Sequence, residues 1–160
     1  MTGTWGVISD THGKLDPRVA GIFAGVEGVL HAGDICGEQV LEALSDVAPV
    51  LAVYGNNDDA PLTTRLPRVG IWTLGGHKVM VVHELKKPES PMLAVRKVIE
   101  AEHPRVVIFG HSHTPTAVEL DGVLYLNPGS PTVRRMSGVS LGVALLHLSS
   151  DSVSHELISL

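Results

Sequence analysis

Cysteine, charged residues and long apolar runs are all scarce in this sequence. The single cysteine, Cys36, excludes an intrachain disulfide and favours a reducing compartment. No apolar run approaches the roughly 20 residues that a membrane-spanning helix needs, and no basic and apolar leader precedes the first expected strand. From these absences we expect a soluble, cytoplasmic protein without a membrane partner.

Basic residues are also few, because 12 Lys and Arg stand against 17 Asp and Glu and leave a formal net charge of −5. General nucleic-acid binding needs a basic face, and this balance argues against it. A phosphate substrate is not excluded, since bound metal cations would reverse the sign of the local field.

The residues that are plentiful indicate a folded protein. Hydrophobic residues make up 44% of the chain and charged residues 18%, which excludes disorder. A chain of 160 residues can bury a sizeable core, and we assign one domain to residues 1–160. Nine histidines are many beside 12 Lys and Arg, so their positions become the main question.

The first half of the chain predicts alternating strands and helices. Asp16 and Pro17 are typical of a helix start, and apolar spacing favours a second helix that buries Val40, Leu41 and Leu44. The expected order is strand 4–9, helix 17–26, strand 28–31, helix 38–44 and strand 50–54. A β-α-β-α-β order predicts a parallel sheet with a site beyond the carboxyl ends of its strands.

The second half predicts hairpins around a single helix. Gly75-Gly76-His77 and Asp121-Gly122 are typical hairpin turns, and Ser90 and Pro91 indicate a helix start, with the helix ending before Pro104. The expected strands are 69–74, 78–83, 105–109, 116–120, 123–126, 140–148 and 152–160. We therefore expect an α/β domain with one more parallel and one more antiparallel sheet.

Polar side chains with ligand atoms follow five of the expected strands. The seven candidates are Asp10, His12, Asp34, Asn56, His83, His111 and His113. All donate through oxygen or nitrogen and none is a thiolate, which favours Mn²⁺, with Fe²⁺, Zn²⁺ or Ni²⁺ as alternatives, over a cysteine-bound structural zinc. Seven ligands are too many for one ion with an open position and suit two ions that share a carboxylate.

Two such ions would suit a phosphate ester. Two carboxylates against two divalent cations leave about two positive charges, which a hydroxide and an anionic substrate can balance. Ions roughly 3.5–4 Å apart lower the pKa of a shared water and hold the oxygens of an in-line displacement at phosphorus.

As a set and in this order, the motifs resemble the calcineurin-like metallophosphoesterase superfamily, and most closely its small bacterial and archaeal phosphodiesterases. The motifs are Asp10-Thr11-His12, Gly33-Asp34, Gly55-Asn56-Asn57-Asp58, His83, Gly110-His111-Ser112-His113 and Asn127-Pro128-Gly129-Ser130. The resemblance implies a four-layer α-β-β-α sandwich with its site at the strand ends.

The resemblance also implies how the ligands divide between two ions. One ion would be held by Asp10, His12, Asp34 and His113. Asp34 would bridge to a second ion, which Asn56, His83 and His111 would also hold.

Three positions depart from the family pattern. Many relatives have a proton-donating histidine where this chain has Asn57, and an amide can bind a phosphate oxygen but cannot act as a general acid. Glu84 stands where relatives usually have glycine. The arginine that protein phosphatases carry after Gly-Asp is missing from 33–37.

The expected activity is therefore hydrolysis of a small phosphate ester, with diesters favoured over monoesters and protein phosphatase disfavoured. A metal-bridging hydroxide would attack phosphorus, Asp34 would bridge the ions and Asn57 would position the phosphate. The alternative is a non-catalytic scaffold, as in the retromer subunit that shares this fold. The natural substrate and a homo-oligomeric state are left open.

Several neighbouring residues have two readings. His31 is either a partner of the ligands or a packed strand residue. Asp58 is expected to support the loop of Asn56, with a solvated loop residue as the alternative. Cys36 is read as a small packing residue, and Arg134 and Arg135 as a surface pair.

Overall fold

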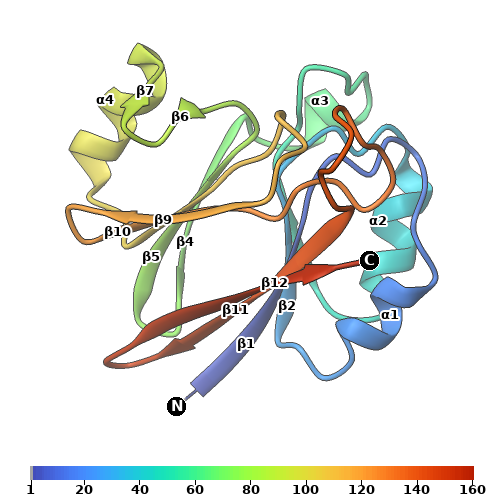
Figure 1. Ribbon diagram of the computed structural model, residues 1–160, viewed down its shortest axis with the longest axis horizontal. Helices are drawn as coiled ribbons and strands as arrows, with labels where there is room; N and C mark the ends of the chain where they lie inside the picture. The colour runs from blue at the N-terminus through green and yellow to red at the C-terminus, as the bar shows by residue number, and fades with distance from the viewer. Residues whose placement is uncertain (1) are drawn as a thin grey trace.

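Two five-stranded sheets stacked face to face form the centre of the molecule (Figure 1). The computed structural model describes residues 2–160. The first sheet has the order β12-β11-β1-β2-β3, in which β1, β2 and β3 are parallel and the last two strands of the chain add antiparallel beside β1. Its strands are β1 (Thr2–Ile8), β2 (Gly28–His31), β3 (Val50–Ala52), β11 (Gly142–Ser149) and β12 (Val153–Ser159).

The second sheet has the order β4-β5-β8-β10-β9. Its three central strands β5, β8 and β10 are parallel, and each edge strand pairs antiparallel with its neighbour. The strands are β4 (Val69–Leu74), β5 (His77–Val82), β8 (Val106–Ile108), β9 (Thr116–Leu120) and β10 (Val123–Asn127).

Helices cover the two outer faces of this pair of sheets (Figure 1). The helices α1 (Arg18–Ile22) and α2 (Glu38–Ser45) pack on the first sheet, and α4 (Leu93–Glu102) packs on the second. A four-residue helix, α3 (Leu62–Arg65), leads into β4. Among residues 2–160, no helix is long and apolar enough to cross a membrane.

Three separate layers of buried apolar side chains hold the four layers together. Side chains of a strand alternate between faces, so Val106 and Ile108 lie between the sheets while Val107 lies under α4. In the same way Val7 faces the second sheet and Ile8 faces the helices α1 and α2. Each fully buried side chain of this kind contributes about 1.5–3 kcal/mol. The predicted four-layer α-β-β-α sandwich is confirmed.

Two predicted helix boundaries are wrong. The helix expected over 17–26 ends at Ile22, because glycine disfavours a helix interior and Gly25 adopts a positive φ of 81°. Ser90 and Pro91 do not begin α4; they form β7 (Ser90–Pro91), which pairs with β6 (Lys86–Lys87). The Met92 N–H then donates to the Leu85 carbonyl oxygen (3.1 Å), and the helix begins at Leu93.

Candidate metal centre

The seven predicted ligands come from the carboxyl ends of strands in both sheets. Asp10 and His12 follow β1, Asp34 follows β2 and Asn56 follows β3. From the second sheet, His83 follows β5, whereas His111 and His113 follow β8. Parallel strands place these ends at one edge of each sheet, and the stacked sheets bring the two edges together.

The first group of ligand atoms joins the loop after β1 to the loop after β8. The Nε2 atom of His113 lies 3.0 Å from Asp10 Oδ1, and His12 Nε2 lies 3.8 Å from the same oxygen. The two imidazole nitrogens are 3.2 Å apart. Asp10, His12 and His113 therefore offer one oxygen and two nitrogens within 4.8 Å of one another.

The second group is built around Asp34 and His83. His83 Nε2 lies 3.4 Å from Asp34 Oδ2 and 4.0 Å from Asp10 Oδ1. The amide oxygen of Asn56 continues the group, 2.9 Å from His83 Nε2 and 3.1 Å from His111 Nδ1. All seven predicted residues therefore line one continuous cluster.

The two groups share a carboxylate. Asp10 belongs to both, and Asp34 Oδ2 lies between His83 Nε2 and His12 Nε2, at 3.4 and 3.8 Å. The arrangement fits two adjacent cations, and the specific role of Asp34 as the bridging ligand stays a prediction.

An unpartnered oxygen indicates that this cluster is built for cations. Asp10 Oδ1 is buried and has no hydrogen-bond partner among the described residues, although two imidazole nitrogens face it. The contact to His113 is not aligned as a hydrogen bond. A buried carboxylate oxygen without a donor is costly, and a cation held jointly with the facing nitrogens removes that cost. The donor set therefore fits divalent metal ions.

Both carboxylates are ionised at neutral pH. Burial disfavours the charged form of Asp10, but the imidazoles of His113 and His12 outweigh it and hold the pKa of Asp10 well below its usual range. Burial also disfavours the charged form of Asp34, but His83 and the Asn57 N–H outweigh it and lower the pKa of Asp34 to about 2. In return, Asp10 raises the pKa of His12.

The backbone of the ligand loops is left-handed at five of the seven positions. Asp10, His12, Asp34, His111 and His113 all have φ between 48° and 70°. Side chains with a β-carbon adopt this region at a cost of order 1 kcal/mol or more each. These turns direct the ligand side chains toward the shared edge, which is the gain that offsets the strain.

His31 ties two ligand loops together. The Gly33 N–H donates to His31 Nδ1 at 3.1 Å, so Nε2 carries the proton and donates to Thr11 Oγ1 at 3.1 Å. The Thr11 hydroxyl in turn donates to the Ile35 carbonyl oxygen at 3.2 Å. Burial lowers the pKa of His31 to about 4, which keeps it neutral. His31 is thus a buried residue of β2 that bonds the neighbours of ligands, Thr11 and Gly33, and so joins their loops.

Asp58 joins the loop of Asp34 to the loop of Asn56. Its buried carboxylate accepts the Cys36 N–H at 2.7 Å and the Gly55 N–H at 2.8 Å. The two loops approach so closely that a β-carbon on Gly33, whose φ is 98°, would lie 2.8 Å from the Gly55 nitrogen. The expected support of the Asn56 loop by Asp58 is confirmed.

Supporting residues not predicted as such surround Asp10. Ser9 Oγ donates to Asp10 Oδ2 at 2.6 Å, and Ser130 Oγ donates to the Asp10 carbonyl oxygen at 2.8 Å. Asn127 Nδ2 donates to the Gly110 carbonyl oxygen at 3.1 Å. Asn127 and Ser130 were part of a recognised motif without an assigned role, whereas Ser9 carried no signal beyond its place before Asp10.

The two residues that depart from the family pattern lie against the ligands. The backbone N–H and the side-chain Nδ2 of Asn57 both donate to the Asp34 carboxylate at 2.8 Å. Glu84 Oε1 lies 3.9 Å from His111 Nε2. Arg135 is close enough to His12 to oppose the rise in its pKa.

Cys36 lies exposed beside the cluster. Its Sγ is 3.8 Å from His12 Nδ1 and 3.6 Å from the Asn57 carbonyl oxygen. Burial and the nearby Asp58 and Asp34 raise the pKa of this thiol to about 11, so a thiolate ligand or nucleophile is disfavoured at neutral pH.

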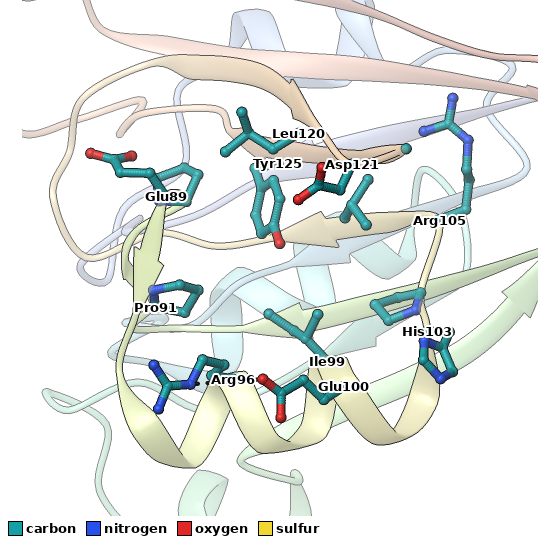
Figure 2. Close-up of a pocket in the computed structure, with 14 residues that line it drawn as sticks. Glu89, Pro91, Arg96, Ile99, Glu100, His103, Arg105, Leu120, Asp121 and Tyr125 are labelled. Carbon is teal, nitrogen blue, oxygen red and sulfur yellow. Dashed lines mark ion pairs between the residues drawn. The ribbon is translucent and has the colours of Figure 1, made fainter.

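Two cavities adjoin the cluster. One of about 450 Å³ includes Asn56 and His83 in its wall, and one of about 230 Å³ includes Asn57 and Cys36. A third cavity, of about 780 Å³ between α4 and the β9–β10 hairpin, contains none of the seven ligands (Figure 2). Both adjoining cavities therefore offer room for a group bonded to a phosphate at the cluster.

Comparisons with known proteins agree with this site. Residues 4–151 match the family model described as calcineurin-like phosphoesterase superfamily domain. A Methanocaldococcus jannaschii protein named as a probable metallophosphoesterase is 38% identical over 136 residues, which cover 81% of this chain and 69% of that protein. A protein of the same archaeon named as a phosphodiesterase is 28% identical over 140 residues, which cover 78% and 81%.

A solved structure shares the fold. Vps29 from Entamoeba histolytica, determined in complex with Zn²⁺, superimposes with a TM-score of 0.73 over 98% of each chain at 23% identity. The family match, the relatives and the fold agree: the chain belongs to the calcineurin-like phosphoesterase superfamily.

Proposed function

We propose that this protein is a dinuclear metal-dependent phosphodiesterase that hydrolyses a small organic phosphate ester, with Mn²⁺ as its metal. The observation that carries the proposal is the pair of carboxylate–imidazole groups that share Asp10. One ion would be held by Asp10, His12, Asp34 and His113. Asp34 would bridge to the other, which Asn56, His83 and His111 would also hold. A bound ion pair would supply a nucleophile at neutral pH and stabilise charge on the phosphoryl oxygens.

The residues of the chain would bind, orient and hold protons around that pair. The Ala32 carbonyl oxygen lies 2.8 Å from His83 Nδ1, which favours a proton on Nδ1 and leaves Nε2 free as a ligand. Asn57 lies next to Asp34, where its amide can turn to donate to a phosphoryl oxygen. The Asn57 amide cannot protonate a leaving group, so substrates whose leaving group is stable as an anion are favoured.

Charge at Glu84 supports the preference for diesters. Its carboxylate lies 3.9 Å from His111 and lines the larger of the two adjoining cavities. A phosphodiester carries one negative charge near neutral pH, whereas a phosphomonoester carries nearly two, so the carboxylate repels the monoester more. The relative named as a phosphodiesterase adds support.

Replacement of Asp34 tests the proposal. With Mn²⁺ added, Asp34→Ala is expected to reduce hydrolysis of bis(p-nitrophenyl) phosphate by at least about a hundredfold, because both ions lose a neighbouring carboxylate. Asp46→Ala, an exposed carboxylate after α2, is the control and should retain full activity. Full activity in Asp34→Ala would refute the role of Asp34.

The alternative is a metal-binding scaffold, the non-catalytic reading that the fold shared with Vps29 keeps open. The complete set of seven ligand side chains around one cluster argues against it. Metal binding by calorimetry without turnover of either mono- or diesters would favour the scaffold instead.

A further inference from the structure

The cavity of about 450 Å³ beside the metal cluster has one polar side and one apolar side. Its polar side contains the ligands Asn56 and His83 together with Glu84. Its apolar side is formed by Val82 of β5 and by three side chains of α4, listed here in chain order: Ala94, Val95 and Val98. Val82 and Val95 are almost fully buried, so this wall is part of the packed layer between α4 and the second sheet.

A wall of this kind suits a flat apolar group. Tyr54, in the loop that follows β3, adds an aromatic ring to the lining. A volume of about 450 Å³ lies within the range of small-molecule sites and exceeds what a phosphate alone would fill. Because the cavity opens on two of the metal ligands, a group bonded to a phosphate held by the metals would enter it directly.

Among residues 2–160, the cation that lines this cavity, Arg68, forms no ion pair. Arg68 is the exposed residue just before the edge strand β4, whose first residue Val69 pairs with Val82 at the end of β5, and it lines the cavity together with His83. In the described part of the chain its guanidinium forms no ion pair, although Glu84 lines the same cavity. A guanidinium prefers a planar anion that accepts two hydrogen bonds.

The cavity of about 780 Å³ between α4 and the β9–β10 hairpin has no arginine without an ion pair among the described residues. Its two arginines are both engaged: Arg96 with Glu100 at 3.9 Å, drawn as a dashed line in Figure 2, and Arg105 with Glu119 at 3.1 Å. Of these two cavities, the one of about 450 Å³ combines an arginine without an ion pair, in the described part of the chain, with the predicted metal ligands Asn56 and His83.

We propose that the substrate is a phosphodiester in which one ester group is aromatic and carries a second acidic substituent. The aromatic ring would pack between Tyr54 and the α4 side chains, and Arg68 would bind the acidic substituent. Arg68 is thus a specificity-determining residue. This inference rests on the proposed function, because the metals would hold the phosphoryl group at the mouth of the cavity.

The test uses two ligands that differ by one carboxylate. Methyl 4-carboxyphenylphosphonate and methyl phenylphosphonate each carry an aromatic ring on a stable P–C bond, so neither loses the ring. Calorimetric titration of the Mn²⁺-loaded protein should show about tenfold tighter binding of the carboxylated ligand. Arg68→Gln should bring the two affinities together, whereas Lys97→Gln, an exposed cation of α4 outside the cavity, should keep the tenfold preference.

A second variant tests the apolar wall. Ala94 is exposed, so Ala94→Trp should fill the cavity without disturbing the core and should weaken binding of both ligands. Leu93→Trp, at an exposed neighbour that does not line the cavity, should leave both affinities as they are.

The outcomes separate this inference from the proposed function. Hydrolysis of bis(p-nitrophenyl) phosphate, which has no acidic substituent for Arg68 to bind, is measured in parallel and reports whether the metal centre is active. Equal affinities for the two phosphonates in an active protein would overturn the inference only. Equal weakening of both ligands by Arg68→Gln would also overturn it, because Arg68 would then act on the phosphoryl group. If the unmodified, Mn²⁺-loaded protein does not hydrolyse bis(p-nitrophenyl) phosphate at all, the proposed function is contradicted.

Discussion

Glu84 adds a negative charge to a site whose substrate is itself an anion. Because it lies beside His111 and lines the adjoining cavity, it acts on any phosphate bound there. In the proposed function, an acid at this position would distinguish substrates by their charge, which glycine could not do.

Removal of this charge should change the substrate preference. Glu84→Gln keeps the shape of the side chain, and we expect the kcat/KM ratio of monoester to diester to rise roughly fivefold, which corresponds to about 1 kcal/mol of relieved repulsion. The measurement compares p-nitrophenyl phosphate with bis(p-nitrophenyl) phosphate. Glu89→Gln, an exposed acid outside this cavity, is the control. An unchanged ratio would show that Glu84 does not face the substrate.

His31 makes the metal-free protein sensitive to acid. Burial lowers its pKa to about 4 in the folded state, against about 6.5 when unfolded. Its contribution is therefore fully present above pH 6.5 and is lost as the pH falls toward 4, by on the order of 3 kcal/mol. Urea denaturation in EDTA measures the unfolding free energy between pH 7.5 and 4. This free energy should fall less steeply with decreasing pH in His31→Gln than in the unmodified protein.

The matched control for this experiment is His155→Gln, an exposed histidine of β12, which should follow the unmodified protein. An identical pH dependence for His31→Gln would show that His31 is protonated in the fold.

At the residue scale, the sequence predicted ligand types better than the contacts around them. Asp10 and His111 could be named because oxygen and nitrogen donors follow expected strands in a known order. The hydrogen bond from Ser9 to Asp10 could not, because a serine before an aspartate is common and its rotamer depends on the fold. The proton position on His31 likewise depends on the Gly33 N–H that faces it.

At the element scale, the site depends on loops held to one another more than on the strands that carry them. Asp58 is the clearest case, because it accepts one N–H from each of two ligand loops. Neither loop has regular secondary structure over these residues, so these bonds fix the distance between them.

Asp58→Asn should loosen that connection. The amide can accept only one of the two N–H groups and presents its own donors to the other, so we expect a loss of about 2 kcal/mol in unfolding free energy and about tenfold weaker Mn²⁺ binding. Chemical denaturation and calorimetry measure the two effects. Asp59→Asn, at the adjacent exposed residue, should change neither the unfolding free energy nor Mn²⁺ binding. Equal effects at both positions would argue against the role of Asp58 in holding the two loops together.

The start of α4 shows where local signals mislead. Ser90 and Pro91 are good residues for a helix start, yet they pair with Lys86–Lys87 in a two-stranded hairpin. Such a pairing depends on residues before the serine, and a pattern read over one turn does not include them. The end of α1 was equally hidden, because Gly21 lies within the helix whereas Gly25 lies beyond it.

At the scale of the whole molecule, the metal cluster lies across both sheets. Four of the ligands follow strands of the first sheet: Asp10, His12, Asp34 and Asn56. The other three follow strands of the second sheet: His83, His111 and His113. Bound ions would therefore stabilise the stacking of the sheets as well as the site. The sequence predicted two sheets, but only the stacking reveals that their ligand edges coincide.

Added metal should raise the melting temperature. A ligand present at a hundred times its Kd contributes about 2.7 kcal/mol, which corresponds to about 5–10 °C for a domain of this size. Calorimetric scans in EDTA and in Mn²⁺ measure the difference. Asp10→Ala should abolish the shift and Asp46→Ala should retain it, whereas equal melting temperatures with and without metal would contradict a joint site.

The order of strands in the first sheet has a consequence for how the protein is made. β1 pairs with β11 from Thr2↔Ser149 to Val7↔Ala144, so during synthesis β1 has no antiparallel neighbour until residues 142–149 have left the ribosome. Contacts this distant along the chain form slowly and leave an open strand edge in the meantime. The edge of β1 that β11 later covers is thus open while more than a hundred intervening residues are made, and the loop of Asp10 waits for Ser130 before its hydrogen bonds are complete.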